Sequence, residues 1–142
     1  VFVFLAAFLF AQFEQRDKIQ THRKNVWEMY HTALKPWAEK HGVGLPHVPH
    51  DCEQTYHTFY MLLPNLELRQ KFILFLRERG IYSVFHYLPL HLSDMGQGFG
   101  YKPGEFPVTE KISDRLIRLP FHNALTSNDQ EQVMDTILEF KF

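Results

Sequence analysis

The chain has 142 residues, with 15 Lys+Arg against 16 Asp+Glu, so its formal net charge is −1. This length suits one domain, and 45% hydrophobic with 22% charged residues excludes a disordered or collagen-like chain. The near-neutral balance, with no basic or acidic tail, also argues against a nucleic-acid partner. The sequence begins at Val1 with the apolar run VFVFLAAFLF, and we expect it to be one part of a longer protein.

The cysteine content and the apolar residues 1–11 indicate where in the cell the protein is expected. Cys52 is the single cysteine, so no intramolecular disulfide forms and a cytoplasmic location is expected. Residues 1–11 are too few to span a bilayer, which needs about 20 apolar residues, and a polar stretch follows directly. We expect no membrane association. In the isolated chain, Phe4, Phe8 and Phe10 are expected to pack between copies.

A long helix is predicted at the beginning of the chain. From Leu5 to about Lys40, mostly apolar residues recur every three or four positions, which is typical of one helical stripe, with Arg16 and Arg23 as polar interruptions. Pro36 is expected to kink or end the helix, and Gly42 to close it. Residues 43–55 contain two prolines and predict an extended linker.

A strand–helix–strand unit follows. Residues 56–63 and 81–87 predict strands, and residues 66–79 predict a helix capped by Asn65 and ended by Gly80. Because its connections are very short, the two strands are expected to run parallel, with a third strand in or beside the gap.

The last part of the chain begins with a long loop. Residues 92–107 hold four glycines and two prolines and predict a lid or binding loop. A helix over 109–117, a short strand over 118–121 and a helix capped by Thr126 or Ser127 are expected next. The sum predicts an α+β domain with a two- to three-stranded sheet and helices packed on one face.

The sequence does not favour a zinc site, a cysteine nucleophile or a phosphate-binding loop. The pairs His47/His50 and His86/His91 lack the spacing and further ligands of a zinc site, and we expect no metal. Cys52 has no evident activating partner, and no phosphate-binding glycine motif occurs. His86 lies where a strand breaks before the glycine-rich loop, so a binding role and a buried structural role both remain open.

A series of motifs nevertheless resembles a known family. These are AQFE at residues 11–14, HTFY at 57–60, FHYLPLH at 85–91, TE at 109–110 and RLIRLP at 115–120. In this order they resemble the C-terminal small domain of the DegT/DnrJ/StrS sugar aminotransferases, from about Leu5 onward. Within the family, the resemblance is strongest to the transaminases that make dTDP-4-amino-4,6-dideoxygalactose from dTDP-4-keto-6-deoxyglucose.

The resemblance implies a fold-type I, pyridoxal-phosphate-dependent enzyme of bacteria that works as a homodimer. Residues 1–40 would be the long inter-domain helix and residues 41–142 the small domain. The large domain, with the cofactor lysine, is absent from this chain. The implied reaction moves an amino group, from glutamate, to C4 of a dTDP-4-keto-6-deoxyhexose, for surface polysaccharides such as lipopolysaccharide and enterobacterial common antigen.

The same resemblance assigns this chain a substrate-side wall and no catalytic, cofactor-binding or metal-binding residue. The residues it places against the dTDP-sugar are His86, Tyr87, His91, His57, Tyr101 and Lys102. The alternative interpretation is a non-catalytic α+β binding or regulatory module, because one fold supports many functions.

Overall fold

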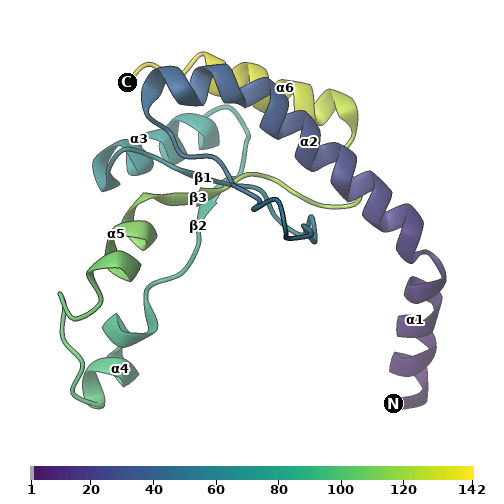
Figure 1. The fold of residues 1–142 in the computed structure, drawn as a ribbon, viewed down its shortest axis with the longest axis horizontal. Helices are drawn as coiled ribbons and strands as arrows, with labels where there is room; N and C mark the ends of the chain where they lie inside the picture. The colour runs from purple at the N-terminus through teal and green to yellow at the C-terminus, as the bar shows by residue number, and fades with distance from the viewer. Residues whose placement is uncertain (1) are drawn as a thin grey trace.

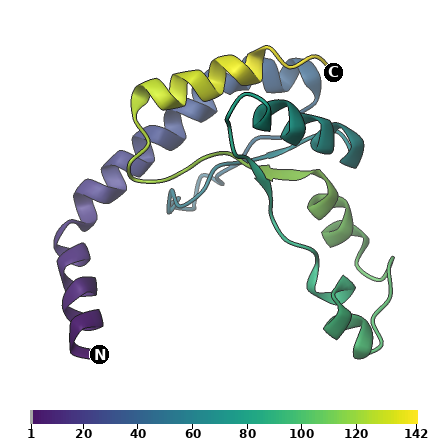
Figure 2. The same ribbon diagram turned by 180° about the vertical axis from the view of Figure 1, so that it is seen from behind.

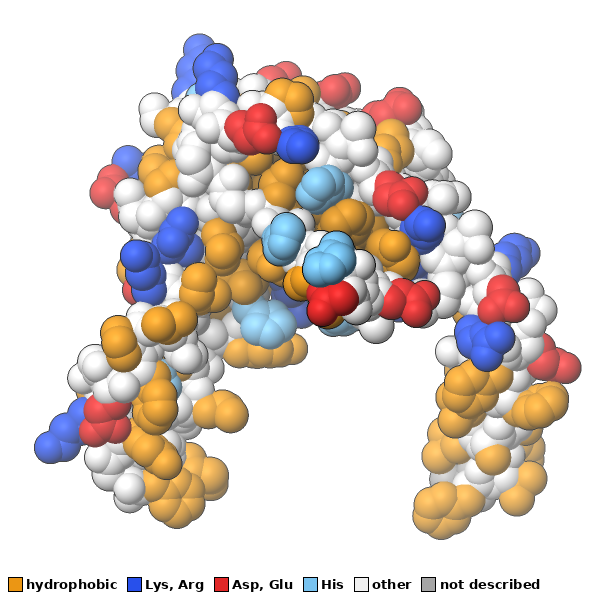
Figure 3. All heavy atoms as spheres, in the orientation of Figure 1, with side chains coloured by type: hydrophobic (Ala, Val, Ile, Leu, Met, Phe, Trp, Pro, Cys, Tyr) orange, Lys and Arg blue, Asp and Glu red, His pale blue; other side chains and the backbone are white. Residues whose placement is uncertain are grey.

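The computed structural model describes residues 2–142, and the chain has the outline of an arch (Figure 1). The elements are α1 (Phe2–Glu14), α2 (Arg16–His41), β1 (Tyr60–Leu62), α3 (Leu66–Arg77), β2 (Val84–Phe85), the 3-10 helix η1 (Leu90–Leu92), α4 (Asp94–Gly98), α5 (Pro107–Arg115), β3 (Leu116–Arg118) and α6 (Ser127–Leu138). The helices α2, α3 and α6 and a sheet form the body, α1 forms one limb, and the short helices η1 and α4 together with α5 form the other. The space-filling view shows the hollow between the limbs (Figure 3).

The long N-terminal helix differs from its prediction in two ways. It is divided at Gln15, whose ψ of 6° departs from helical geometry, so that α1 and α2 point in different directions (Figure 1). None of the side chains of α1 is buried, so no tertiary packing holds it in line with α2. Pro36, by contrast, is accommodated inside α2. The helix ends at His41, where Gly42 adopts the left-handed conformation (φ 65°) and donates its N–H to the carbonyl of Ala38.

The sheet confirms the predicted strand arrangement. β3 lies between β1 and β2 and is antiparallel to both, so β1 and β2 run parallel to each other with the third strand in the gap. Ile117 of β3 is paired with Met61 on one side and Phe85 on the other. The strands are shorter than predicted, and β3 begins at Leu116 because α5 already ends at Arg115.

The hydrophobic core lies between one face of the sheet and the helices α2, α3 and α6. Figures 1 and 2 show α6 lying alongside α2 from both sides of the molecule. Two buried polar groups join these elements: the Tyr30 hydroxyl donates to the carbonyl of Pro120 (3.1 Å), and the Gln130 amide donates to the carbonyl of Val26. Fully buried side chains of the core are Tyr30, Leu34, Phe59, Met61, Leu63, Phe72, Leu76, Ile117 and Ile137.

Helix caps follow the local sequence closely. The Asn65 side chain accepts from the Leu68 amide (2.9 Å), as predicted, and Thr126 forms a reciprocal capping box with Asp129. α5 begins at Pro107, two residues before the predicted start, because proline at the first helical position needs no hydrogen-bond acceptor.

The segment 92–107 departs most from its prediction. Its glycine and proline content predicts a lid or binding loop, but in the structure Leu92 is the last residue of η1 and the helix α4 follows. These short helices and α5 form the limb opposite α1 (Figures 1 and 2).

Candidate functional site

The site begins where the chain leaves the sheet after β2. His86 and Tyr87 are both exposed, and their rings lie 4.7 Å apart. The Arg118 guanidinium lies 5.4 Å from the centre of the Tyr87 ring, and the Ser113 hydroxyl donates to the Tyr87 carbonyl (2.9 Å). This segment is therefore tied to β3 and α5 and presents two aromatic side chains to its surroundings.

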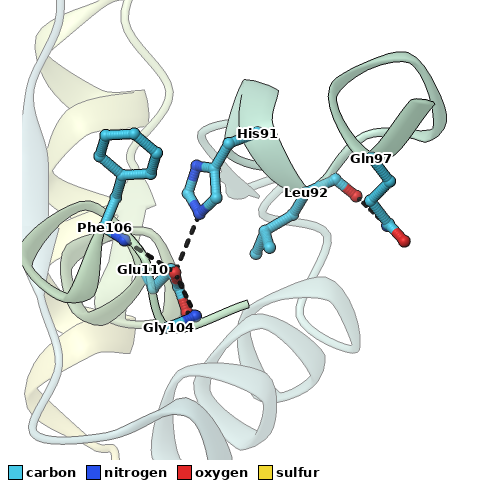
Figure 4. Close-up of polar contacts among 6 residues, drawn as sticks. All are labelled: His91, Leu92, Gln97, Gly104, Phe106 and Glu110. Carbon is cyan, nitrogen blue, oxygen red and sulfur yellow. Dashed lines mark hydrogen bonds and ion pairs between the residues drawn. The ribbon is translucent and has the colours of Figure 1, made fainter. Parts of the chain in front are cut away.

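His91 lies five residues further on, in η1, and its environment is different. The side chain is buried, with 8% of its surface exposed. Its Nε2 lies 2.9 Å from Oε1 of Glu110 in α5, and its ring centre lies 4.7 Å from that of Phe106 (Figure 4). η1 and α5 are thus joined by one imidazole–carboxylate contact.

Glu110 also holds the chain that returns from α4. Its carboxylate accepts from the Gly104 amide (2.8 and 3.0 Å) and from the Phe106 amide (3.4 Å) (Figure 4). The hydrogen bond from His91, followed by those from Gly104 and Phe106, lowers the pKa of Glu110 below its ordinary value of 4.5. The group is therefore a carboxylate at neutral pH and can only accept hydrogen bonds.

α4 packs on η1 through small and polar residues. Ser93 caps α4 by accepting from the Gly96 amide (3.1 Å), and its hydroxyl donates to the Leu90 carbonyl (2.7 Å). The Gln97 side chain donates to the Leu92 carbonyl (2.8 Å; Figure 4). Together with Glu110, these contacts make residues 90–106 an ordered structure.

An open cavity of about 550 Å³ lies on this limb. Its walls are mostly apolar and aromatic, with few polar groups, which is typical of small-molecule sites. The residues that line it are Leu90, His91, Ser93, Met95, Gly96, Phe99, Tyr101, Phe106 and Thr109.

The predicted site residues are distributed over three places. His91 and Tyr101 line the cavity, and Lys102 is exposed beside Tyr101. His86 and Tyr87 lie on the strand exit that leads to it. His57 is exposed next to β1, where its Nδ1 lies 2.9 Å from the Thr55 hydroxyl. Whether these residues contact a substrate stays a prediction.

Nothing in the sequence marks Glu110 or Arg118 as a site residue. Glu110 lies in a predicted helix start and in the TE motif, and Arg118 lies in the RLIRLP motif. A carboxylate in the first turn of a helix is common for electrostatic reasons alone, so its position gave no signal of a contact with His91.

The linker histidines occupy a separate surface. His47, His50 and Cys52 line an open depression of about 730 Å³ beside Trp27 and His31. Within residues 2–142, no three His, Cys, Asp or Glu side chains gather as a metal site would require. Over the same range, no helix combines the length and apolarity needed to cross a bilayer.

The residues present do not form a site for pyridoxal phosphate. A lysine that binds this cofactor covalently is usually activated by burial or by neighbouring charges. The side chains of all eight lysines are exposed in the described structure, and none lines the cavity beside His91. No chemical step of the cofactor can therefore be assigned to this chain.

Comparison with known proteins identifies similar chains. A pleiotropic regulatory protein from Geobacillus stearothermophilus is 31% identical over 137 residues, which are 95% of this chain and 36% of that protein. A dTDP-3-amino-3,4,6-trideoxy-alpha-D-glucose transaminase from Micromonospora megalomicea subsp. nigra is 26% identical over 125 residues, 87% of this chain and 33% of that enzyme. The chain therefore spans about a third of the length of the curated relatives it matches.

One solved structure is similar to this chain in both sequence and fold. DesV from S. venezuelae, solved in complex with a ketimine intermediate, superposes with a TM-score of 0.85 at 27% identity, covering 94% of this chain and 35% of DesV. The model of the DegT/DnrJ/EryC1/StrS aminotransferase family matches residues 3–138, nearly the whole sequence. The chain belongs to the DegT/DnrJ/EryC1/StrS aminotransferase family.

Proposed function

We propose that this chain is the small domain of a pyridoxal-phosphate-dependent sugar-nucleotide aminotransferase and forms the substrate-side wall of its active site. The observation that carries the proposal is the cavity of about 550 Å³ on the 90–109 limb of a chain whose residues 3–138 match the aminotransferase family. Its apolar walls suit the ring faces and methyl group of a deoxysugar nucleotide, and its few polar groups would fix the orientation.

The proposed roles of the residues follow from their positions. His91 and Tyr101 line the cavity and would hydrogen-bond the sugar, while His86 and Tyr87 would extend the wall toward the sheet. Lys102, exposed beside Tyr101, would meet a phosphate oxygen. His57 stays a weaker candidate, because it does not line this cavity.

The proposal also assigns partners to the apolar limb. All of α1 is exposed, and its large side chains from Phe2 to Phe13 are between 54% and 88% accessible. Apolar surface of this extent is usually covered by another protein surface. We assign that role to the enzyme's own large domain, which would bring the cofactor and its lysine, and to the second subunit of a homodimer.

The finer specificity is part of the proposal. We infer amino transfer from glutamate to C4 of a dTDP-4-keto-6-deoxyhexose in the bacterial cytoplasm, for surface polysaccharide assembly. The motifs FHYLPLH and RLIRLP support this assignment, whereas the Micromonospora relative is named for a 3-amino sugar. The test is to incubate the full-length enzyme with glutamate and either the 4-keto or the 3-keto dTDP-6-deoxyhexose. Amination of the 3-keto sugar alone would reject C4 specificity.

Two experiments test the proposal that the cofactor lysine belongs to the large domain and not to this chain. The 142-residue chain, treated with pyridoxal phosphate and then borohydride, should show no saturable labelling of one lysine by mass spectrometry. Stoichiometric labelling at a single site would contradict the assignment of the reactive lysine to the large domain. The coding sequence upstream of Val1 should contain an in-frame large domain with that lysine, and a start codon at Val1 would overturn the proposal.

A second candidate function is a non-catalytic regulatory module. The observation that favours it is the 31% identical relative, which is named a pleiotropic regulatory protein. The same upstream sequence separates the two candidates, because a regulatory protein that has lost catalysis needs no cofactor lysine in its large domain.

A further inference from the structure

Glu110 restricts the chemistry that His91 can offer to a ligand. As an ionised carboxylate, Glu110 is a hydrogen-bond acceptor only, so its 2.9 Å contact with His91 requires a proton on Nε2. A neutral imidazole carries one ring proton. When that proton is on Nε2, Nδ1 is left with a lone pair and acts as an acceptor.

We propose that Glu110 is a positioning residue, which fixes His91 as the Nε2–H tautomer and presents Nδ1 as the acceptor for a ligand hydroxyl. The proposal deepens the proposed function and rests on it for the identity of the ligand. It selects between two kinds of contact open to His91. In the neutral Nε2–H tautomer, a sugar hydroxyl can donate to Nδ1, whereas an ionised phosphate oxygen has no proton to donate.

The geometry shows how the ring is held. Its orientation is fixed on one edge by Glu110 and on one side by Phe106, whose ring lies at 56° to it. The carboxylate is fixed in turn by the amides of Gly104 and Phe106, so it cannot rotate freely away from the histidine. Figure 4 shows the Nε2 edge directed at Glu110, while the other ring nitrogen faces away from it.

The second nitrogen is available for a ligand. Among residues 2–142, none makes a hydrogen bond to Nδ1 of His91, and the side chain lines the cavity. A histidine whose one nitrogen is occupied by a carboxylate and whose other nitrogen meets the reacting partner is a recurrent arrangement, because the carboxylate fixes both tautomer and orientation. Here we assign the arrangement to binding, because the described residues that line the cavity with His91 include no lysine, cysteine or carboxylate.

The first test measures the tautomer directly. In the 142-residue chain with ¹⁵N-labelled histidine at pH 8.5, where an ordinary imidazole is neutral, we expect His91 to show a protonated Nε2 and an unprotonated Nδ1. We also expect the Nε2 proton to exchange slowly with water. Glu110→Ala should abolish this protection, Glu110→Gln should keep part of it through the amide oxygen, and the exposed neighbour change Glu105→Ala should leave it intact. A proton on Nδ1, or unchanged protection in Glu110→Ala, would overturn the proposal.

The second test uses the full-length enzyme and asks what Nδ1 binds. Loss of one oriented hydrogen bond should raise KM for the sugar nucleotide about tenfold in Glu110→Ala, with Glu110→Gln intermediate and Glu105→Ala unchanged. The KM for glutamate should not change. If the tautomer signature is lost but KM for the sugar nucleotide is unaffected, the substrate wall under the proposed function is wrong, although Glu110 still positions the ring. If the signature itself is unaffected, the positioning role is wrong whatever KM shows.

Discussion

A pair of glycines in α4 provides a matched test of how the cavity limb is built. Gly96 is buried against η1: a Cβ added to it would lie 2.3 Å from the Leu90 carbonyl oxygen and 2.8 Å from the Cα of His91. Gly98 lies in the same helix, and a Cβ added there would meet nothing within 4 Å. Gly96→Ala and Gly98→Ala therefore add the same methyl group to the same helix, with and without a steric conflict.

The size of the conflict follows from the distances. An ordinary contact between a methyl carbon and an oxygen needs about 3.4 Å, so α4 and η1 must separate by about 1 Å. The groups met by the methyl are backbone atoms, which cannot rotate away, and overpacking of this kind costs about 1–3 kcal/mol. Gly98→Ala should instead stabilise α4 by about 0.4–1 kcal/mol, because it reduces the freedom of the unfolded chain.

The strain should be visible locally rather than in the whole molecule. α4 packs on η1, away from the core between the sheet and α2, α3 and α6, so the limb can yield while the body stays folded. We expect Gly96→Ala to speed amide hydrogen exchange across residues 90–106 by about fivefold to a hundredfold. The midpoint of global urea unfolding should stay within experimental error of the parent chain.

The control decides whether packing of α4 on η1 is the cause. Gly98→Ala should leave exchange over residues 90–106 unchanged or slower. Equal exchange in the two alanine variants would refute the close packing of Gly96, and with it the geometry that holds His91 in η1.

Three further predictions concern the body and the limb. Leu34→Ala should lower the free energy of unfolding by about 2–5 kcal/mol in urea titration, because Leu34 is fully buried, whereas Leu138→Ala, at a half-exposed position, should cost far less. Thr126→Ala should cost about 1 kcal/mol by removing the capping box with Asp129, and thermal unfolding should return to the parent value if serine replaces threonine instead. Glu110 has a lowered pKa in the folded chain, so its stabilising contribution is present above about pH 4.5 and is lost as the pH falls through the folded pKa. The protection factors of amides over residues 90–106, which correct exchange for its intrinsic pH dependence, should fall in the parent chain between pH 6 and pH 3 and stay constant in Glu110→Gln.

The parts of the fold that the sequence predicts are those set by neighbouring residues. The caps at Asn65 and Thr126 depend on contacts over three positions, and the parallel direction of β1 and β2 follows from their short connections to α3, although these connections leave open whether the third strand lies in or beside the gap. The break at Gln15 has only an ambiguous local mark. Arg16 interrupts the apolar stripe there, but Arg23 interrupts it in the same way and α2 continues past it, so the helix divides where no tertiary packing supports α1.

The candidate site also has a part that the sequence predicts and a part that it does not. The motif FHYLPLH directs attention to His86 and His91, and the structure places His91 on a cavity. The order around residues 92–107, however, depends on polar contacts between residues far apart along the chain, such as His91 and Glu110, which are 19 positions apart. Hydrophobic periodicity and turn composition contain no information on polar contacts of that range, so the glycine and proline content predicts a binding loop but neither the short helix α4 nor the contact with Glu110.

The body and the limb that carries the cavity are stabilised by different interactions. The body is stabilised by burial of apolar side chains, so core substitutions such as Leu34→Ala should lower global stability while leaving the cavity residues in place. The limb has only a few buried residues and is ordered by backbone packing at Gly96 and by the hydrogen bonds of Glu110. Substitutions there should alter His91 and the cavity at almost no cost in global stability. The geometry of the candidate site and the stability of the fold therefore depend on separate sets of residues, which allows sequence change on the limb to alter ligand specificity while the body keeps its fold.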